Sequence, residues 1–370
     1  MSVLDELSAA TIATLERYGF DTGRFDSLRA RVAAGELSAA SNVVRGEVEP
    51  PPPDELTNLP EPATDAWHDL REAGLEAIGQ GRVAQIVLAG GMATRFGGVV
   101  KAAVDVLDGS SFLEWKLGET RRLAAETGAS IPIALMTSFA TDADTRRHVG
   151  PLESELLWFT QFVSLRLTPA GDLFREDDGS VSMYGPGHGD LLEAIRSSGT
   201  LGTLRDRGVE VVSISNVDNL GARIDPVVLG AHLAGARPVT IEVARKDGDM
   251  GGAPALVDGR LLLLEAPRFP PGFDHDSIPV FNTNTAWISA EALERAYDLS
   301  WLYVEKDVDG RTAVQLERLY HEITMFVPST FLVVPRAGPR GRFFPIKTPA
   351  DLERSREALR EMLATSVADR

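Results

Sequence analysis

Residues 84–98 read AQIVLAGGMATRFGG, and this stretch decides the fold. The apolar run 84–89 predicts a buried strand, and it leads directly into a loop that contains four glycines. Glycines let the backbone approach a ligand closely, and successive backbone N–H groups form a nest that binds anions. Arg95 and Lys101 add positive charge beside this loop. The stretch therefore suits a polyphosphate better than the alternative, a plain tight turn between a strand and a helix.

Two well-known phosphate loops do not fit this spacing. A Walker loop needs a glycine, four residues and then Gly-Lys-Ser or Gly-Lys-Thr, which the stretch lacks. A dinucleotide fingerprint needs G-x-G-x-x-G, but Met92 or Ala93 occupies the second glycine position here. The region about 20 residues further on, where that fold needs a strand ending in an acid, has a helical pattern. A nicotinamide oxidoreductase is therefore not favoured.

The flanking sequence alternates between strand and helix patterns. Apolar runs occupy 84–89, 131–137, 209–215 and 238–245, and helical patterns occupy 111–127, 141–149, 188–197 and 225–235. Such alternation predicts an α/β fold with a mainly parallel sheet, whose ligands bind at the carboxyl ends of the strands. Further strands are expected at 279–288, 301–305 and 325–334, a hairpin about Asp258-Gly259 at 254–264, and a closing helix at 349–364.

The first 81 residues have a different texture. Residues 1–45 predict two amphipathic helices, and 64–81 predict another. Between them, 46–62 carry Pro50–Pro53, Pro60 and Pro62, so we expect an extended connector there with neither helix nor sheet. The predicted organisation is a helical arm and connector at 1–81, a catalytic core at 82–335, and a short segment with one helix at 336–370.

Composition narrows the functional class. The chain of 370 residues has a formal charge of −17, which argues against binding nucleic acid or an anionic membrane. It has no cysteine, which excludes disulfides, thiolate metal sites and cysteine nucleophiles and fits a cytoplasmic location. No apolar run reaches the roughly 18 residues that span a bilayer. The first 20 residues lack the basic start and apolar stretch of a secretory signal, so none is expected.

Seven segments together carry a family resemblance. They are the glycine-rich loop, MTSF with Thr141-Asp142 at 136–142, GPGHGD at 185–190, NVDNLG at 216–221, Lys246 with Gly251-Gly252, FNTN at 281–284, and PIKT with Asp351-Leu352 at 345–352. In this order they resemble the eukaryote-like UTP–glucose-1-phosphate uridylyltransferases, or UDP-glucose pyrophosphorylases. The resemblance implies a Rossmann-like nucleotidyltransferase (GT-A-like) fold with a mixed, mainly parallel sheet and an N-terminal helical extension.

The resemblance also implies a reaction. A phosphate oxygen of glucose 1-phosphate would attack the α-phosphorus of UTP, giving UDP-glucose and pyrophosphate. Because that nucleophile is already anionic, catalysis would depend on alignment and on charge neutralisation, with Mg²⁺ as the cofactor. A hard carboxylate after a strand, Asp218, suits that metal.

Site residues follow from the matched motifs. The cations expected at the reacting phosphates are Arg95, Lys101, Lys246 and Lys347. The residues expected at the nucleotide are Leu88, Ala89, Gly90, Gly91, Gln161, Gly187, His188, Asn216 and Asp218, the last also as the metal ligand. The residues expected at the sugar are Asn219, Gly221, Gly252, Glu265, Asn282 and Asn284. The other histidines show no ligand spacing and are interpreted as surface or packing residues.

The chain departs from the family pattern at four places. Ala93 replaces a loop glycine, Val100 stands where the family has proline before Lys101, and Thr285 stands where an asparagine often follows FNTN. Only 18 residues follow Leu352, so we do not expect the C-terminal β-helix of eukaryotic relatives, and the oligomeric state stays open. Two alternatives remain: a uridylyltransferase for N-acetylglucosamine or galactose 1-phosphate, and a non-catalytic protein that binds nucleotide sugars.

Overall fold

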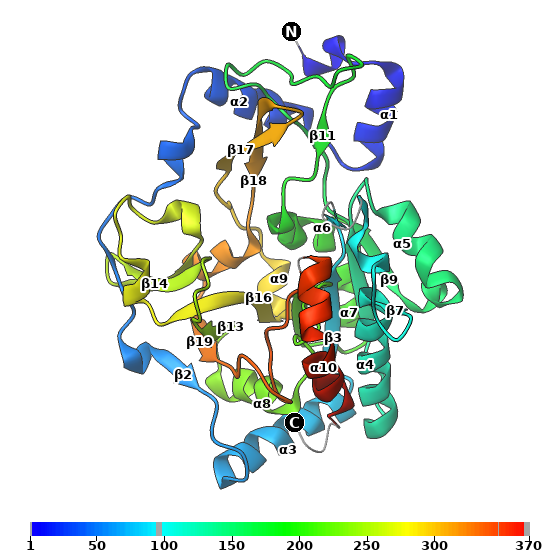
Figure 1. Ribbon diagram of the computed structural model, residues 1–370, viewed down its shortest axis with the longest axis vertical. Helices are drawn as coiled ribbons and strands as arrows, with labels where there is room; N and C mark the ends of the chain where they lie inside the picture. Colours follow the sequence, from blue (N-terminus) through cyan, green and yellow to red (C-terminus); the bar gives the residue numbers. More distant parts are fainter. Residues whose placement is uncertain (1, 94–97, 347, 366–370) are drawn as a thin grey trace.

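A central sheet of eight strands organises the computed structural model, which describes residues 2–93, 98–346 and 348–365 (Figure 1). Within these residues every neighbouring pair is parallel except the two pairs made by β16, so the sheet is mixed and mainly parallel, as predicted. The strand order is β2 (Leu56–Asn58), β19 (Ser329–Val333), β13 (Val239–Arg245), β16 (Val280–Ser289), β12 (Val211–Asn216), β3 (Val83–Leu88), β8 (Ile133–Thr137) and β9 (Leu157–Thr160).

The chain order reverses across β3. From β3 the chain crosses through α4 (Phe112–Thr127) to β8 on one side, and β12 pairs with β3 on the other side. Leu88 at the end of β3 is in register with Asn216 at the end of β12. The loops that follow these two strands therefore start side by side, at the point where α/β sheets open a ligand crevice.

Helices cover both faces of the sheet, because its strands are apolar on both sides. One face packs against α3 (Asp65–Gly79), α4, α8 (Pro226–Gly235) and α10 (Pro349–Ala364). The opposite face packs against α6 (Leu191–Ser197), α7 (Thr200–Asp206) and α9 (Ala290–Glu294). A further helix, α5 (Asp142–Val149), follows β8. No helix among the described residues is long and apolar enough to cross a bilayer.

A smaller apolar cluster joins the N-terminal helices to segments from the middle of the chain. It is built from α1 (Ala9–Arg17), α2 (Thr22–Ala33), β10 (Ser164–Leu165), β11 (Met183–Tyr184), β17 (Leu302–Val308) and β18 (Arg311–Glu317). Figure 1 shows these elements together at the top of the molecule. Small antiparallel pairings elsewhere join β1 (Val48–Glu49), β14 (Ala253–Val257) and β15 (Arg260–Leu264), then β4 (Met92–Ala93) with β5 (Val99–Val100), and β6 (Asp105–Leu107) with β7 (Ser110–Ser111).

Most predicted elements are present, but one prediction is wrong. The hairpin about Asp258-Gly259 is confirmed, with φ of 48° and 75° at its two turn residues, and the closing helix is confirmed as α10. The proline-rich stretch, however, contains β1 and β2, and β2 forms one edge of the main sheet. β1 is two residues long and directly precedes Pro50, and β2 is three residues long and lies between Pro53 and Pro60. Proline is compatible with short edge strands, so the density of prolines was not a sufficient reason to exclude strands here.

Helices α3 and α8 approach each other so closely that glycine is required at the contact. A Cβ atom built on Gly74 of α3 would lie 1.9 Å from the carbonyl oxygen of Pro226. A Cβ on Gly230 of α8 would lie equally close, at 1.9 Å, to the carbonyl oxygen of Leu70. Because backbone atoms cannot move aside as a flexible side chain can, these positions fix the spacing of the two helices.

We predict that Gly74→Ala destabilises the protein by about 1–3 kcal/mol, because the added methyl forces the two helices apart. Gly79→Ala in the same helix is the matched control, since a Cβ there has nothing within 4 Å. That control is expected to be neutral or slightly stabilising, because alanine favours the helix. Urea unfolding of both variants measures the difference. Equal stabilities would show that the α3–α8 contact tolerates a side chain.

Candidate functional site

A cavity of about 490 Å³ opens at the carboxyl edge of the sheet, between the loops that follow β3 and β12. Its size lies within the range of small-molecule sites. The residues that line it come from many parts of the chain: Leu88, Gly90, Gly91, Met92, Lys101, Met136, Ser138, Phe139, Ala140, Gln161, Arg166, Met183, Tyr184, Gly185, Gly187, His188, Asn216, Val217, Asp218 and Gln315.

Most of the residues expected at the nucleotide lie in this one wall. They are Leu88, Gly90, Gly91, Gln161, Gly187, His188, Asn216 and Asp218, and Lys101 joins them. Ala89 is buried behind the wall, where its carbonyl oxygen accepts a hydrogen bond. Arg95 and Lys347 lie outside the described residues. The sequence therefore identified a set of residues that the fold does bring together.

Gln161 lies against two glycines, one on each of two loops. A Cβ on Gly185 would lie 2.0 Å from its Nε2, and a Cβ on Gly90 would lie 3.2 Å from the same atom. The backbone N–H of Gln161 donates to the carbonyl oxygen of Thr137 at the end of β8. The glycines thus leave room for an amide that presents both a donor and an acceptor to the cavity.

The MTSF segment and the nearby Thr141 hydrogen-bond to the backbone at the start of the glycine-rich loop. The hydroxyl of Ser138 donates to the carbonyl oxygen of Gly90 at 2.9 Å, and the hydroxyl of Thr141 donates to that of Ala89 at 3.0 Å. Thr137 in turn donates to Asp142 at 2.7 Å. These bonds fix the start of the loop at the cavity floor, and Ser138 also lines the cavity.

The GPGHGD segment passes tightly against β18. Gly187 has φ of 94°, and a Cβ there would lie 2.7 Å from the carbonyl oxygen of Arg318. The buried Asp190 accepts from the Arg318 guanidinium at 2.5 Å, which holds the turn in place. His188, in the short 3-10 helix His188–Asp190, faces the cavity, and burial lowers its pKa to about 3. It is therefore neutral near pH 7 and can offer hydrogen bonds but no positive charge.

Lys101 and Asp218 face each other across the crevice. The Nζ of Lys101 lies 2.8 Å from Oδ2 of Asp218, and their side chains are 28% and 14% exposed. Lys101 comes from the 3-10 helix Lys101–Ala103 after the glycine-rich loop, and Asp218 comes from the loop after β12. A cation and a hard carboxylate thus meet where a phosphate chain would enter.

A second lysine is buried directly behind this pair. Lys116 of α4 donates to the hydroxyl of Ser215 at 2.9 Å and to the carbonyl oxygen of Ala222 at 2.6 Å. It therefore binds both ends of the loop that carries Asp218. Burial, followed by repulsion from Arg342, lowers the pKa of Lys116 to about 7. Its place in an ordinary amphipathic helix gave no sign of this role.

The expected sugar residues form a separate cluster. The Nδ2 of Asn282 donates to Glu265 at 3.3 Å and to Oδ1 of Asn284 at 3.1 Å, and a Cβ on Gly252 would lie 2.7 Å from Glu265. Although burial alone would raise it, the pKa of Glu265 is lowered by His321, whose Nδ1 lies 3.5 Å from the carboxylate.

This sugar cluster borders the cavity through histidine contacts. The ring of His321 packs edge-on against that of His188, with centroids 5.4 Å apart, and His188 lines the cavity. Lys246 lies apart from the cavity wall, where it donates to the carbonyl oxygen of His275. Burial lowers the pKa of Lys246, although nearby aspartates oppose that change.

Asn219 and Gly221 do not lie with the other residues that were predicted to bind the sugar. The Oδ1 of Asn219 accepts from the backbone of Gly221 and of Phe344, and its Nδ2 donates to the carbonyl oxygen of Arg342. A Cβ on Gly221 would lie 2.7 Å from the carbonyl carbon of Arg342. Both residues therefore hold the C-terminal segment against the loop that carries Asp218. The amide of Asn219 is hydrogen-bonded to the backbone of that segment, and Gly221 leaves room for the backbone of Arg342 to pass.

Sequence reasoning missed one wall of the cavity. Arg166 of the segment after β10 donates to the hydroxyl of Ser182 at 2.7 Å and lines the cavity beside Tyr184 and Gln315. Burial lowers the pKa of Arg166, although Glu176 opposes this effect. These residues come from short segments outside the main sheet, where no motif or strand ending pointed to them.

A mainly parallel sheet with a glycine-rich loop, a lysine and a carboxylate at its switch point defines a nucleotidyltransferase-type α/β protein. The sequence agrees with this class. The chain belongs to the UTP–glucose-1-phosphate uridylyltransferase family, which matches residues 24–367.

Known relatives and solved structures similar to this chain are uridylyltransferases for UDP-sugars. The UTP–glucose-1-phosphate uridylyltransferase of Hordeum vulgare is 30% identical, over 86% of this chain and 72% of its own. A variant of the Leishmania major UDP-glucose pyrophosphorylase in complex with UDP-glucose is 25% identical, with a TM-score of 0.69 and coverage of 95% and 79%. The Trypanosoma brucei UDP-N-acetylglucosamine pyrophosphorylase shares the fold, with a TM-score of 0.76 at 21% identity over 94% and 79%.

Several curated relatives are longer than this chain. The chain spans 61% of one such uridylyltransferase, 58% of another and 63% of a third.

We predict that Lys116 makes stability depend on pH. With a pKa of about 7 in the folded protein and 10.5 as its ordinary value, burying the charged amine costs stability below pH 7. Between these values the unfolded chain binds more protons, so this cost is relieved as pH rises, by up to about 1.4 kcal/mol per pH unit. Lys116→Met should flatten the dependence between pH 7 and 9, and denaturant unfolding across that range measures it.

The control for this experiment is Lys306→Met, which removes a lysine whose side chain is half-exposed. That variant should follow the wild-type dependence on pH, since groups that titrate elsewhere in the molecule are common to both. Parallel curves for wild type and Lys116→Met would show that the buried amine keeps its charge throughout.

Proposed function

We propose that this chain forms UDP-glucose and pyrophosphate from UTP and glucose 1-phosphate. One observation carries the proposal: a single cavity at the switch point of the sheet brings together an amide and glycines for a base with Lys101 and Asp218 for phosphates. Membership of the uridylyltransferase family supports the reaction type.

Different residues along the cavity would bind the base, the phosphates and the sugar. Gln161, between Gly90 and Gly185, is placed to hydrogen-bond the uracil edge, since an amide can satisfy a carbonyl and an N–H together. We assign the phosphates to Lys101, which lies 2.8 Å from Asp218. The sugar would bind beyond His188, toward Glu265, Asn282 and Asn284, whose carboxylate and amides suit hydroxyl groups.

The chemistry needs no general base. A phosphate oxygen of glucose 1-phosphate attacks the α-phosphorus of UTP, and the bond to the β-phosphate breaks to release pyrophosphate. The nucleophile is already ionised near pH 7, so the chain contributes alignment and positive charge. Lys101 now pairs with Asp218 and would exchange that partner for the incoming phosphates, with Arg95 and Lys347 as further cations. Lys246 donates to the carbonyl oxygen of His275 outside the cavity wall, so it would have to leave that partner to reach the phosphates.

We propose Mg²⁺ as the cofactor, with Asp218 as its protein ligand. Among the described residues no group of three or more histidine, aspartate or glutamate side chains could hold a metal alone. That fits magnesium, which is commonly held by one or two carboxylates together with substrate phosphates and water. When bound, the ion would neutralise charge on the phosphate oxygens. Asp218 would fix its place relative to Lys101.

The decisive experiment is a substrate panel with the full chain. With UTP and Mg²⁺, pyrophosphate release and the UDP-sugar product are measured for glucose, galactose and N-acetylglucosamine 1-phosphate. We expect glucose 1-phosphate to give the highest kcat/KM, and Asp218→Ala to lower kcat at least a hundredfold. The matched control Asp206→Ala, on the exposed end of α7, should retain wild-type turnover.

Other results of the substrate panel would favour one of the two alternative functions. Highest kcat/KM with another sugar would assign the chain to that sugar, and release with none would favour a non-catalytic protein that binds nucleotide sugars. Unchanged turnover in Asp218→Ala would remove this residue from the site.

We further predict that Gln161 selects the nucleotide. Gln161→Ala should raise the KM for UTP about tenfold or more, because the uracil edge loses its partner, and should narrow the preference for UTP over CTP. Steady-state kinetics with UTP, CTP, ATP and GTP measure both effects. Gln80→Ala, an exposed glutamine at the end of α3, is the control. An unchanged nucleotide preference would assign uracil recognition to another part of the wall.

A further inference from the structure

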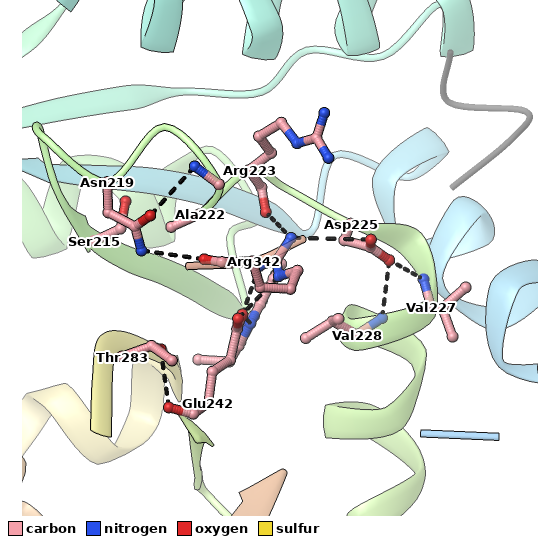
Figure 2. A network of polar contacts seen from close by, with 12 residues as sticks. Ser215, Asn219, Ala222, Arg223, Asp225, Val227, Val228, Glu242, Thr283 and Arg342 are labelled. Atoms are coloured by element: carbon pink, nitrogen blue, oxygen red, sulfur yellow. Dashed lines mark hydrogen bonds and ion pairs between the residues drawn. The ribbon is translucent and has the colours of Figure 1, made fainter. Parts of the chain in front are cut away.

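Arg342 is the centre of a buried polar network that reaches the loop after β12 (Figure 2). Its side chain is 2% exposed. Its Nε lies 2.9 Å from Oε2 of Glu242, and its Nη2 lies 2.5 Å from Oε1, so the two groups pair through both oxygens. Its Nη1 donates to the carbonyl oxygen of Arg223 at 2.7 Å and lies 3.9 Å from Asp225.

Glu242 attaches this network to the interior of the sheet. It lies on β13 with 0% exposure, and its Oε1 also accepts from the indole N–H of Trp287 on β16 at 2.8 Å. Its backbone carbonyl accepts from the hydroxyl of Thr283. Two central strands therefore fix the carboxylate that Arg342 reaches, so the guanidinium has a rigid anchor.

The backbone at Arg342 holds the loop that carries Asp218. The Nδ2 of Asn219 donates to the carbonyl oxygen of Arg342 at 3.1 Å, and Phe344 N–H donates to Oδ1 of Asn219 at 2.8 Å. Asn219 also forms an isolated antiparallel bridge with Pro345. Figure 2 shows Asn219 directed at the Arg342 carbonyl, while the side chain of Arg342 extends to Glu242.

Arg342 thus connects three parts of the chain: β13 through Glu242, the loop that carries Asp218 through Asn219, and its own segment 342–346. The separation of the last two parts matters for the site. Along the sequence Asn219 follows Asp218 directly, and Pro345 is two residues before Lys347. Burying an arginine–glutamate pair is expensive, and apolar replacements of such pairs are often no less stable. Stability alone therefore does not explain why this position holds a charged pair.

We infer that Arg342 is a positioning residue for phosphoryl transfer: its pairing with Glu242 holds the Asp218 loop and the segment 342–346 at a fixed separation. This inference rests on the proposed function, in which Asp218 and Lys347 act on the same group of phosphates. A displacement of one segment by about 1 Å would misalign the reacting groups and lower kcat about a hundredfold.

The test compares Arg342→Met, Glu242→Gln and the double variant, assayed with UTP, glucose 1-phosphate and Mg²⁺. Each single change leaves one charge buried without its partner and should destabilise the fold. The double variant removes both charges and keeps an acceptor for Trp287, so its melting temperature should recover toward wild type. We expect its kcat to stay at least tenfold below wild type, with less than threefold change in the KM for UTP.

Hydrogen exchange gives a readout that does not depend on turnover. In the double variant the amides of 217–222 and 342–346 should exchange at least tenfold faster than in wild type, while those of β13 and β16 stay protected. Ile78→Ala, which removes most of a fully buried side chain of α3 and leaves a cavity, is the control for lost stability and should lower the melting temperature. It should leave kcat and these amides unchanged.

The outcomes separate the two proposals. A wild-type protein that forms no UDP-sugar with any substrate overturns the proposed function, whatever the variants do. An active wild type with a double variant of wild-type kcat and unchanged exchange overturns the positioning role and leaves the pair purely structural. A kcat that returns to wild type together with the melting temperature has the same meaning.

Discussion

The parallel pairing of β3 with β12 on one side and β8 on the other is the constraint on which the site depends. It places the ends of these strands on one edge, beside the end of β9. The glycine-rich loop after β3, Asp218 after β12 and Gln161 after β9 therefore meet, although the loop and Asp218 lie more than 100 residues apart along the chain. Hydrogen bonds from Ser138 and Thr141 then fix the glycine-rich loop to the loop after β8. The cavity is thus a consequence of strand order before any ligand-binding side chain is considered.

Electrostatics adds a second constraint, because the proposed reaction requires a chain of charge −17 to accept anionic substrates. The structure meets it by placing cations at the carboxyl edge: Lys101 and Arg166 in the cavity wall, with Lys116 and Arg342 buried behind it. The buried lysine and arginine bind carbonyl oxygens and Glu242 instead of facing solvent. Burial lowers the pKa of Lys116 to about 7, and Glu242 compensates the charge of Arg342, so the cations that face the cavity among the described residues are Lys101 and Arg166.

The sequence predicted the central strands, the helices between them and the hairpin at Asp258-Gly259, because apolar periodicity and turn chemistry are local signals. It failed where pairing is distant: β2 was hidden among prolines, and β18, which brings Gln315 to the cavity, was not predicted. Gly90 and Asp218 were found because they follow predicted strands, whereas Gln161 was found only through the resemblance of its short segment, because the strand before it, β9 (Leu157–Thr160), was not predicted. Arg166 and Lys116 were missed, since only tertiary packing brings an ordinary arginine and a helical lysine to the site.

The NVDNLG segment shows why a motif cannot be interpreted as a row of ligands. Asp218 faces the cavity, but its neighbour Asn219 uses its amide on the backbone of Arg342 and Phe344, and Gly221 lets that backbone pass. A loop must hold its carboxylate to a fraction of an ångström for phosphoryl transfer, and a flexible loop cannot do so alone. The segment therefore carries its own support, and that support extends through Arg342 to Glu242 in the centre of the sheet.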